Sequence, residues 1–203
     1  MKIGPKYKIA RRLKAPVFEK TQSQKYVLSE SRKTREKKGK KGAMTDYGRQ
    51  LLEKQKARYS YLLTERQFGN YVEAAMARKG VKNADALFEN LETRLDNVVL
   101  RLGLCNTRGG ARQLVSHGHI FVNGKRVSRP SYRVSIGDII KIRDLSLGKG
   151  VFATLDERLK TLTAPAWLSL DAGKKEGKVT AMPRSQGAEL LFDMKSVLEF
   201  YSR

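Results

Sequence analysis

The sequence predicts an α+β fold with three parts: an all-helical domain, a smaller domain of two helices packed on a bent, mostly antiparallel sheet, and a flexible basic N-terminal arm. Apolar residues recur at helical spacing through residues 45–95 and again near the C-terminus. Short apolar runs separated by glycine-containing turns occupy residues 119–142. Residues 31–44, SRKTREKKGKKGAM, are strongly basic and contain few apolar side chains.

The predicted arm covers residues 1–43, which carry 15 basic and 3 acidic side chains. A segment such as 31–44 cannot bury enough apolar surface to order itself, so we expect it to be flexible when alone. A solvated tail or a targeting sequence is the alternative. Tyr7, Phe18 and Tyr26 favour an arm that packs against something, because aromatic side chains stack on bases or dock on protein.

The helical domain is expected over residues 44–92. Thr45 is a suitable N-cap for the segment 45–63, and Thr64 caps a second segment that Gly80 ends. Asn83 opens a third. The apolar stripes that we expect to form the core are Phe68, Val72, Ala75 and Met76, followed by Leu87, Leu91 and Leu95. Residues 185–203 repeat the same pattern, and we expect this last helix to return and complete the domain.

A central domain is expected over residues 93–160. One helix is closed by Gly103, and Thr107 caps a second that Gly118 ends. Strand signals follow at 119–122 and 125–127, with Asn123 and Gly124 suited to a type I′ turn between them. Further short strands are expected around 132–134 and 139–142. Residues 161–184 are expected to connect this domain to the C-terminal helix.

Charge is the strongest compositional signal. The 203 residues include 42 Lys and Arg against 20 Asp and Glu, a net charge of +22. Such an imbalance favours a polyanionic partner, most often nucleic acid, with an anionic membrane surface or compacted DNA as alternatives. The sequence contains no apolar run of 18 residues and no signal-peptide pattern, so we expect a soluble intracellular protein that neither spans a membrane nor forms a homo-oligomer.

Basic side chains concentrate in the central domain, where residues 93–145 hold 10 basic and 3 acidic side chains. Arg108 and Arg112 lie four apart on the second helix, so they should project together. If the helix arginines and the basic residues of the hairpin lie on one face of this domain, they could contact the regularly spaced phosphates of a folded RNA. A solvated charged face is the alternative. Gly109 and Gly110 disfavour helix, so either the helix begins late or bare amides lie near its start.

The two histidines, His117 and His119, suggest a metal site or an acid/base pair. A metal needs further ligands, and Cys105 is the only cysteine. We therefore interpret residues 116–127 as a helix end, a glycine cap, a strand and a tight turn, with Gly118 breaking any face shared by the two rings. The sequence shows no nucleophile motif and no phosphate-binding glycine loop. We expect no catalytic residue, no metal and no cofactor, hence no enzyme.

Several motifs mark a resemblance to a known family. RLDNVV.RLG, TR..ARQLVSHGHI.VNG and PSY.V..GD.I.IR in residues 94–143 resemble the RNA-binding domain named after ribosomal protein S4. This domain also occurs in some pseudouridine synthases and tyrosyl-tRNA synthetases, so an RNA-modifying or other RNA-binding accessory protein is the alternative. GPK.K..RR, DYG.QL.EKQK.R, ERQF..Y, DAGK.EGK and EFYSR extend the resemblance to the bacterial-type S4 family over nearly the whole chain.

The resemblance implies a structural protein of the small ribosomal subunit, in the cytoplasm or an organelle, that binds 16S rRNA early and nucleates assembly. It implies proximity to ribosomal proteins S5 and S3 at the mRNA entrance and, with S5, a part in translational accuracy. Some relatives hold zinc with N-terminal cysteines, whereas this arm has none. Lys40 and Lys41 match positions implied to touch mRNA. The implied rRNA contacts are Arg94, Arg101, Arg108, Arg112, His117, Lys125 and Arg126 in the central domain, Tyr47, Gln50, Lys54 and Arg58 in the helical domain, and Arg11 and Arg12 in the arm.

Overall fold

The computed structural model describes residues 3–36, 44–187 and 189–202. The chain divides into two units, one formed by Met1–Ala84 with Gly187–Arg203 and the other by Asp85–Gln186. The described residues form nine α-helices and one five-stranded antiparallel sheet, which confirms the predicted α+β class. All five strands belong to the second unit, and the first unit is helical.

The N-terminal arm is ordered through packing of its own apolar residues. It forms α1 (Lys6–Leu13), a 3-10 turn η1 (Glu19–Gln22) and α2 (Gln24–Glu36). Leu13, Val17 and Phe18 form a small buried cluster, and the Tyr7 and Tyr26 rings stack with centroids 5.5 Å apart. Residues 31–36, expected to be flexible, continue α2. Lys40 and Lys41 lie outside the described residues.

Helix α3 (Asp46–Ser60) and helix α4 (Glu65–Met76) begin at the predicted threonine caps. The Thr45 hydroxyl accepts a hydrogen bond from the Gly48 amide, and Thr64 forms a reciprocal capping box with Gln67. Helix α4 ends at Met76. Met76 is partly exposed, so the prediction that it belongs to the core is wrong. Gly80 follows in a turn with a positive φ of 79°.

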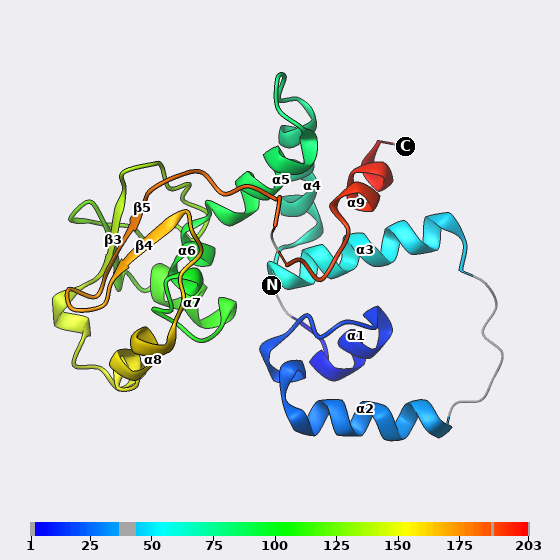
Figure 1. The fold of residues 1–203 in the computed structure, drawn as a ribbon, viewed down its shortest axis with the longest axis horizontal. Helices are drawn as coiled ribbons and strands as arrows, with labels where there is room; N and C mark the ends of the chain where they lie inside the picture. Colours follow the sequence, from blue (N-terminus) through cyan, green and yellow to red (C-terminus); the bar gives the residue numbers. More distant parts are fainter. Residues whose placement is uncertain (1–2, 37–43, 188, 203) are drawn as a thin grey trace. The chain divides into compact units, whose positions relative to one another are not determined.

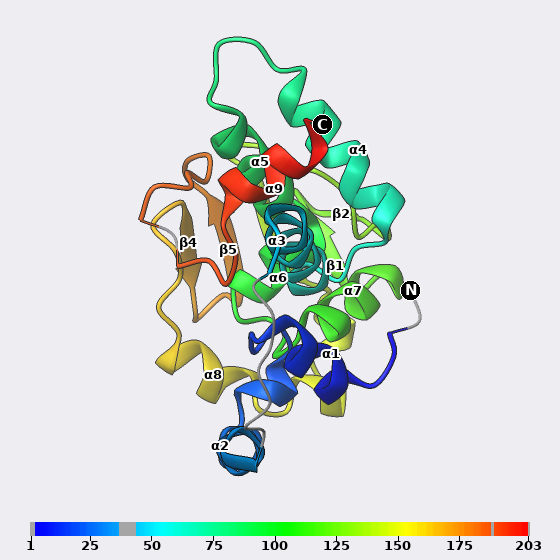
Figure 2. The same cartoon turned by 90° about the vertical axis from the view of Figure 1, so that its right-hand side faces the viewer.

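Helix α9 (Met194–Tyr201) packs on α3 and α4, as expected, and Figure 2 shows it beside α3 viewed end-on. Asp193 caps α9 by accepting from the Lys195 and Ser196 amides. Its aromatic residues reach back into the unit, since Phe200 lies 5.5 Å from Tyr47 and Tyr201 lies 6.1 Å from Phe68, measured between ring centroids. Two separate segments of the chain therefore build this helical unit.

Helices α5 (Asn83–Glu92), α6 (Leu95–Arg101) and α7 (Arg108–Ser116) lead into the second unit, where α6 and α7 lie side by side (Figure 1). Helix α7 begins at Arg108, so the idea of a late start caused by Gly109 and Gly110 is wrong. The Gly110 amide donates to the Thr107 hydroxyl at 3.0 Å, and an alanine there would collide with the Cys105 sulfur. Close packing and the cap therefore account for Gly110.

The sheet has the strand order β2-β1-β3-β5-β4. Its strands are β1 (Ile120–Val122), β2 (Lys125–Arg126), β3 (Ile139–Ile142), β4 (Leu168–Asp171) and β5 (Glu176–Val179). Asn123 and Gly124 have φ values of 51° and 76°, as the predicted type I′ turn requires. Around 132–134 the expected strand is replaced by one bridge, Arg94 with Arg133, because this backbone pairs with the α5–α6 junction.

Residues 161–184 do more than connect, because β4 and β5 lie within them and extend the sheet beside β3. Gly177 in β5 lies under the Leu102 side chain, where any Cβ would overlap it. The turns η2 (Asp144–Ser146) and η3 (Gly150–Phe152) and helix α8 (Leu155–Thr161) join β3 to β4. Leu155, Leu159, Trp167 and Val179 thereby enter the same apolar core as the α6–α7 pair and β1.

Candidate RNA-binding surface

A buried polar network organises the basic side chains of α6 and α7. Glu92, at the end of α5, is only 1% exposed, and its carboxylate accepts hydrogen bonds from Arg101 at 2.9 and 2.8 Å. The Asn97 side-chain amide donates to the same carboxylate at 2.8 Å. Both the Nε and one Nη of Arg108 donate to Asn97 Oδ1, at 3.1 and 2.8 Å. Glu92 and Asn97 together therefore hold two arginines from different helices.

Asp96 holds a second pair of arginines. Its buried carboxylate accepts two hydrogen bonds from Arg94, at 3.0 and 2.6 Å, and two from Arg112, at 3.2 and 3.1 Å. Arg94 is only 3% exposed. A buried carboxylate needs a counter-ion in contact with it, and Arg94 fills that structural role. The expectation that Arg94 contacts RNA from the surface therefore does not fit its position.

The remaining arginines of the network reach solvent. The side chain of Arg101 is 35% exposed and that of Arg112 is 27% exposed, and Arg108 is half-buried. Lys125 and Arg126 on the β1–β2 hairpin are exposed. Guanidinium groups fixed by buried partners lose little further side-chain entropy when they bind a phosphate. The network thus provides preorganised cations in the unit that carries the hairpin.

The two histidines lie closer together than expected. His117 is the C-cap of α7, Gly118 follows with φ of 73°, and His119 precedes β1. We expected Gly118 to separate the two rings, but the rings are nearly parallel, with centroids 6.2 Å apart and an interplanar angle of 18°. The positive φ reverses the chain direction after the helix, and both side chains consequently fall on one side.

Cations surround His119, and the sequence motifs did not single out two of them, Arg143 and Lys149. Burial lowers the pKa of His119, and the positive charges of Lys149, His117, Arg143 and Arg126 lower it further. Its Nδ1 lies 2.9 Å from the buried Ser146 hydroxyl, and Phe152 packs edge-on to its ring. Lys149 lies in a glycine-flanked turn without a regular pattern, so only its tertiary position relates it to His119.

In the helical unit, most predicted RNA contacts have partners within the protein. Lys54 is 7% exposed, donates to Glu65 at 2.6 Å and lies 4.5 Å from the centre of the Phe200 ring. Arg58 donates to Gln55 at 3.0 and 2.7 Å and lies 3.4 Å from Glu65. Lys54 and Arg58 therefore stabilise the packing between α3, α4 and α9 in addition to any outside contact.

Glu65 and Tyr201 complete this cluster. Burial alone would raise the pKa of Glu65, but hydrogen bonds from Lys54 and Tyr201 and the charges of Lys54 and Arg58 lower it below its ordinary value. The pKa of Tyr201 is raised by burial and by the charge and hydrogen bond of Glu65. The phenol therefore stays protonated and donates to the carboxylate at 3.0 Å.

Two predicted contacts on α3 differ in exposure. Tyr47 is half-exposed beside Phe200 and presents its outer face to solvent. Gln50 donates to Glu199 at 3.0 Å, and its buried side-chain oxygen has no hydrogen-bond partner among the described residues. An unsatisfied buried acceptor is uncommon, and it leaves Gln50 able to accept one more hydrogen bond if its surroundings open.

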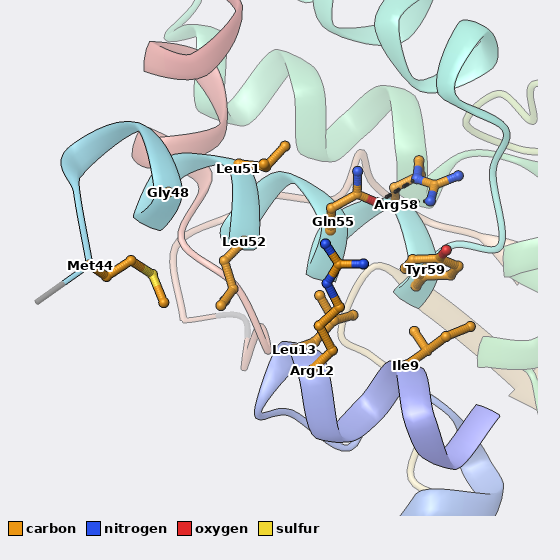
Figure 3. A pocket seen from close by; sticks show the side chains of 10 residues that line it. All are labelled: Ile9, Arg12, Leu13, Met44, Gly48, Leu51, Leu52, Gln55, Arg58 and Tyr59. Carbon is orange, nitrogen blue, oxygen red and sulfur yellow. Dashed lines mark hydrogen bonds between the residues drawn. The ribbon is translucent and has the colours of Figure 1, made fainter. Parts of the chain in front are cut away.

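Arm residues Arg11 and Arg12 point in different directions. Arg11 donates to Glu30 at 3.0 Å and to Ser29 at 3.2 Å, which ties α1 to α2. Arg12 is exposed and points toward α3 across a pocket of about 430 Å³ (Figure 3). The pocket is bounded by α1, Met44 and the side of α3 that runs from Gly48 to Tyr59, and its walls are mostly apolar. Arg12 is thus the arm cation that is better placed for an outside partner.

Among the described residues, no three His, Cys, Asp or Glu side chains are grouped as metal ligands. The described helices include none with the length and apolar character needed to cross a bilayer. In the second unit, a helix pair and the adjacent hairpin carry Arg101, Arg108, Arg112, Lys125 and Arg126. Helix pair, hairpin and fixed arginines define a protein of the RNA-binding class.

Comparisons with known proteins agree with this class. Residues 93–140 match the S4 domain, and residues 1–92 match the Ribosomal protein S4/S9 N-terminal domain. The chain is 42% identical to the small ribosomal subunit protein uS4 of Chloroflexus aurantiacus over 99% of this chain and 98% of that protein. It is 44% identical to uS4 of Roseiflexus castenholzii over the same shares, and 48% identical to uS4 of Roseiflexus sp. strain RS-1 over 79% and 78%. The chain belongs to the uS4 family, whose members are structural, non-enzymatic ribosomal proteins.

Proposed function

We propose that this chain is a primary 16S rRNA-binding constituent of the small ribosomal subunit that nucleates subunit assembly in the cytoplasm. Its family membership supports the ribosomal setting. The observation that carries the rRNA contact is the buried network of Glu92, Asp96 and Asn97, which fixes partly exposed arginines from α6 and α7. Folded RNA has phosphates at set spacings, and a fixed guanidinium array recognises such a pattern through shape.

The surface that we propose for rRNA in the second unit comprises the exposed parts of Arg101, Arg108 and Arg112 together with the hairpin cations. The helix arginines would contact phosphates in bidentate fashion while retaining their carboxylate or amide partners. His117, Lys125 and Arg126 are exposed near the end of α7 and on the hairpin. Arg94 supports this surface from below through Asp96, without touching RNA itself.

The helical unit would supply a second set of rRNA contacts. Tyr47 and Arg12 have exposed surface, so they are the residues of the predicted set that we favour there. Arg11 and Arg58 retain partly exposed guanidinium groups beside their internal partners. Lys54 and Gln50 mainly hold α3 to α4 and α9. We treat the arm and the helical unit as the regions that bind alongside the central RNA-binding domain.

The finer placement in the subunit rests on family resemblance. It comprises proximity to ribosomal proteins S5 and S3 at the mRNA entrance, contact of Lys40 and Lys41 with mRNA, and a contribution with S5 to translational accuracy. Cross-linking of the assembled subunit through each lysine would test the mRNA contact. The lysines should react with mRNA downstream (3′) of the decoding site, whereas reaction with rRNA alone would contradict this part of the proposal.

The central experiment is hydroxyl-radical footprinting of the full chain on free 16S rRNA, with affinities measured in parallel for duplex DNA and anionic vesicles. Protection should concentrate in the 5′ domain, and binding of that RNA should be much tighter than binding of the other two polyanions. Equal affinity for all three would contradict specific rRNA recognition and favour a general polyanion binder. Efficient binding to tRNA with no protection of 16S rRNA would favour an accessory role in RNA modification.

A further inference from the structure

We propose that His117, His119, Arg126, Arg143 and Lys149 form a phosphate site for RNA in which His119 takes up a proton when the phosphate binds. RNA affinity should consequently rise as pH falls through the range in which histidine titrates. The inference rests on the proposed rRNA function and adds a chemical group, a location and a pH dependence to it. It also adds three residues, His119, Arg143 and Lys149, to the predicted set.

Three segments bring these side chains together. His117 ends α7 and His119 precedes β1, with their rings 6.2 Å apart. The Arg126 guanidinium from the hairpin covers Gly118, so closely that a Cβ on residue 118 would overlap it. Arg143 follows β3, and its amide donates to the His119 carbonyl at 2.8 Å. The positions of these side chains are therefore set by the backbone hydrogen bond between Arg143 and His119 and by the absence of a side chain at Gly118.

The segment that begins at Arg143 after β3 continues into the turn that contains Ser146 and Lys149. The Ser146 hydroxyl lies 2.9 Å from His119 Nδ1 and is buried, and the Lys149 amide donates to the Ser146 carbonyl at 3.0 Å. A hydroxyl both donates and accepts, so Ser146 can bond either the neutral or the protonated ring. Proton uptake by His119 therefore does not break this contact, and in the protonated ring the other nitrogen, Nε2, carries a hydrogen and can donate a hydrogen bond to a phosphate oxygen.

Positive charge around His119 is only weakly balanced by acidic groups. The cations on the surrounding segments are Lys125 and Arg126 on β2, Lys141 on β3, and Arg143 and Lys149 after it. Asp144 in η2 is the carboxylate of this segment. Its side chain is 81% exposed, and it lies 3.8 Å from Lys141. Asp96, beneath α7, is already bonded to Arg94 and Arg112. An anion placed among these cations would meet attraction from most sides.

The same charges explain the expected direction of proton movement. In the free protein, burial and then the charges of Lys149, His117, Arg143 and Arg126 lower the pKa of His119, so this ring is neutral at pH 7. A bound phosphate offsets that repulsion and raises the pKa. Because the bound state then holds more protons than the free state, affinity increases as pH falls through the range in which histidine titrates. Each unit of upward pKa shift strengthens binding by up to about tenfold.

The test uses the full chain and a 16S rRNA fragment of the 5′ domain, with Kd measured from pH 8 to pH 5.5 at constant ionic strength. The wild type should bind roughly tenfold more tightly at pH 5.5 than at pH 8. His117→Gln with His119→Gln should reduce that ratio to near one or to the residual ratio of the RNA itself. Lys160→Gln on α8 is the matched control, since it removes one exposed positive charge outside the cluster and should keep the wild-type ratio.

A second measurement separates the site from effects on folding, because His119→Gln also removes the contact with Ser146. The chain has two histidines, so NMR titration resolves each imidazole in the full chain. RNA binding should raise the pKa of His119, and Lys149→Gln should raise it in the free protein by removing a neighbouring charge. Lys149→Gln should also weaken RNA binding at pH 6 by more than Lys160→Gln does.

The outcomes are distinct. RNA binding with no pH dependence, or with a dependence that survives in the double histidine variant, would overturn the proton-linked site and leave the proposed rRNA function standing. An unchanged His119 titration on adding RNA would overturn it as well. Failure of the wild type to bind the 16S fragment at any pH would instead remove the proposed function, and the phosphate site with it.

Discussion

The Glu92 carboxylate, buried at the end of α5, accepts hydrogen bonds from two nitrogens of Arg101, at 2.9 and 2.8 Å. This ion pair joins a residue that is buried in the protein to one that is partly exposed to solvent. A buried carboxylate that loses its charge or its partner destabilises the fold, whereas an exposed pair contributes little. The Glu92–Arg101 pair thus both stabilises the fold and fixes the position of Arg101, a predicted RNA contact.

Replacing Glu92 by glutamine should weaken both properties. Glu92→Gln keeps the size of the side chain but removes the charge that holds Arg101, so we expect a loss of about 2 kcal/mol in the free energy of unfolding. Urea denaturation measures it. Glu89→Gln is the matched control: Glu89 pairs with Arg133, whose side chain is 55% exposed, so the cost should be below about 1 kcal/mol. Equal losses in the two variants would contradict the role assigned to the buried network.

Asn97 should not tolerate an acidic replacement. Asn97→Asp places a second carboxylate where the amide now donates to Glu92 at 2.8 Å, so two like charges would share one buried site. We expect a loss of several kcal/mol at pH 7. The pair would bind a proton with a raised pKa, so stability should recover partly as the pH falls through that pKa. A loss that is independent of pH would show that repulsion is not its cause.

Removing two partly exposed guanidinium groups should change the salt dependence of rRNA binding. Arg101→Gln with Arg112→Gln should lower the affinity and reduce the slope of log Kd against log salt concentration by about one to two, because each phosphate contact contributes roughly 0.7–0.9. Lys160→Gln with Lys174→Gln removes the same charge from exposed positions elsewhere. If the arginine variant is folded and has the wild-type slope, these arginines do not contact phosphate.

Acidification should destabilise the helical unit through Glu65. The pKa of Glu65 is below the 4.5 of a free glutamate because Lys54, Tyr201 and Arg58 outweigh its burial. A carboxyl whose pKa is lowered by folding contributes stability above pH 4.5 and loses it as pH falls through its folded pKa. Glu65→Gln should therefore be less stable than wild type at pH 7, and the gap should narrow toward pH 3.

Thermal unfolding followed from pH 7 to pH 3 measures this difference. Glu73→Gln on the same helix is the control, since Glu73 is exposed and acts on the cluster only through the effect of its charge on Tyr201. A gap between Glu65→Gln and wild type that stays constant over the whole range would contradict the charged role of Glu65.

A methyl group in β5 should disturb the core of the second unit. Gly177→Ala places a Cβ against the buried Leu102 side chain, so we expect a loss of about 1–3 kcal/mol from overpacking. Gly148→Ala, which meets no atom within 4 Å and needs no positive φ, should cost little. Chemical denaturation compares them. Equal stability of Gly177→Ala and wild type would show that Leu102 moves aside freely.

Local chemistry in the sequence predicted the elements that depend on neighbouring residues. Thr45, Thr64 and Thr107 cap helices, and Asn123-Gly124 forms the hairpin turn, because each effect needs only two or three adjacent positions. Strands β4 and β5 were missed because both are short, and lysines and glycines between and within them hide the apolar pattern. Their pairing with β3 depends on distant residues.

The sequence identified the basic residues of the candidate site, but it did not predict which of them are buried. Arg94 and Lys54 were expected at an RNA surface, yet each is buried against a carboxylate. The sequence contains the acids, Asp96 and Glu65, but it does not show which cations they pair with in space. Lys149 was missed for the complementary reason, since its relation to His119 arises only after the segment beyond β3 folds back.

The helical unit is built from two segments that are far apart in the sequence, and this affects how it folds during translation. Helix α9 supplies Val197, Phe200 and Tyr201 to the surfaces of α3 and α4, yet the ribosome makes it only after all of residues 85–186. The apolar surface of α3 and α4 that α9 covers therefore stays exposed until the whole second unit has left the ribosome. The central unit has all its core residues within one continuous segment, so it can complete its fold co-translationally first.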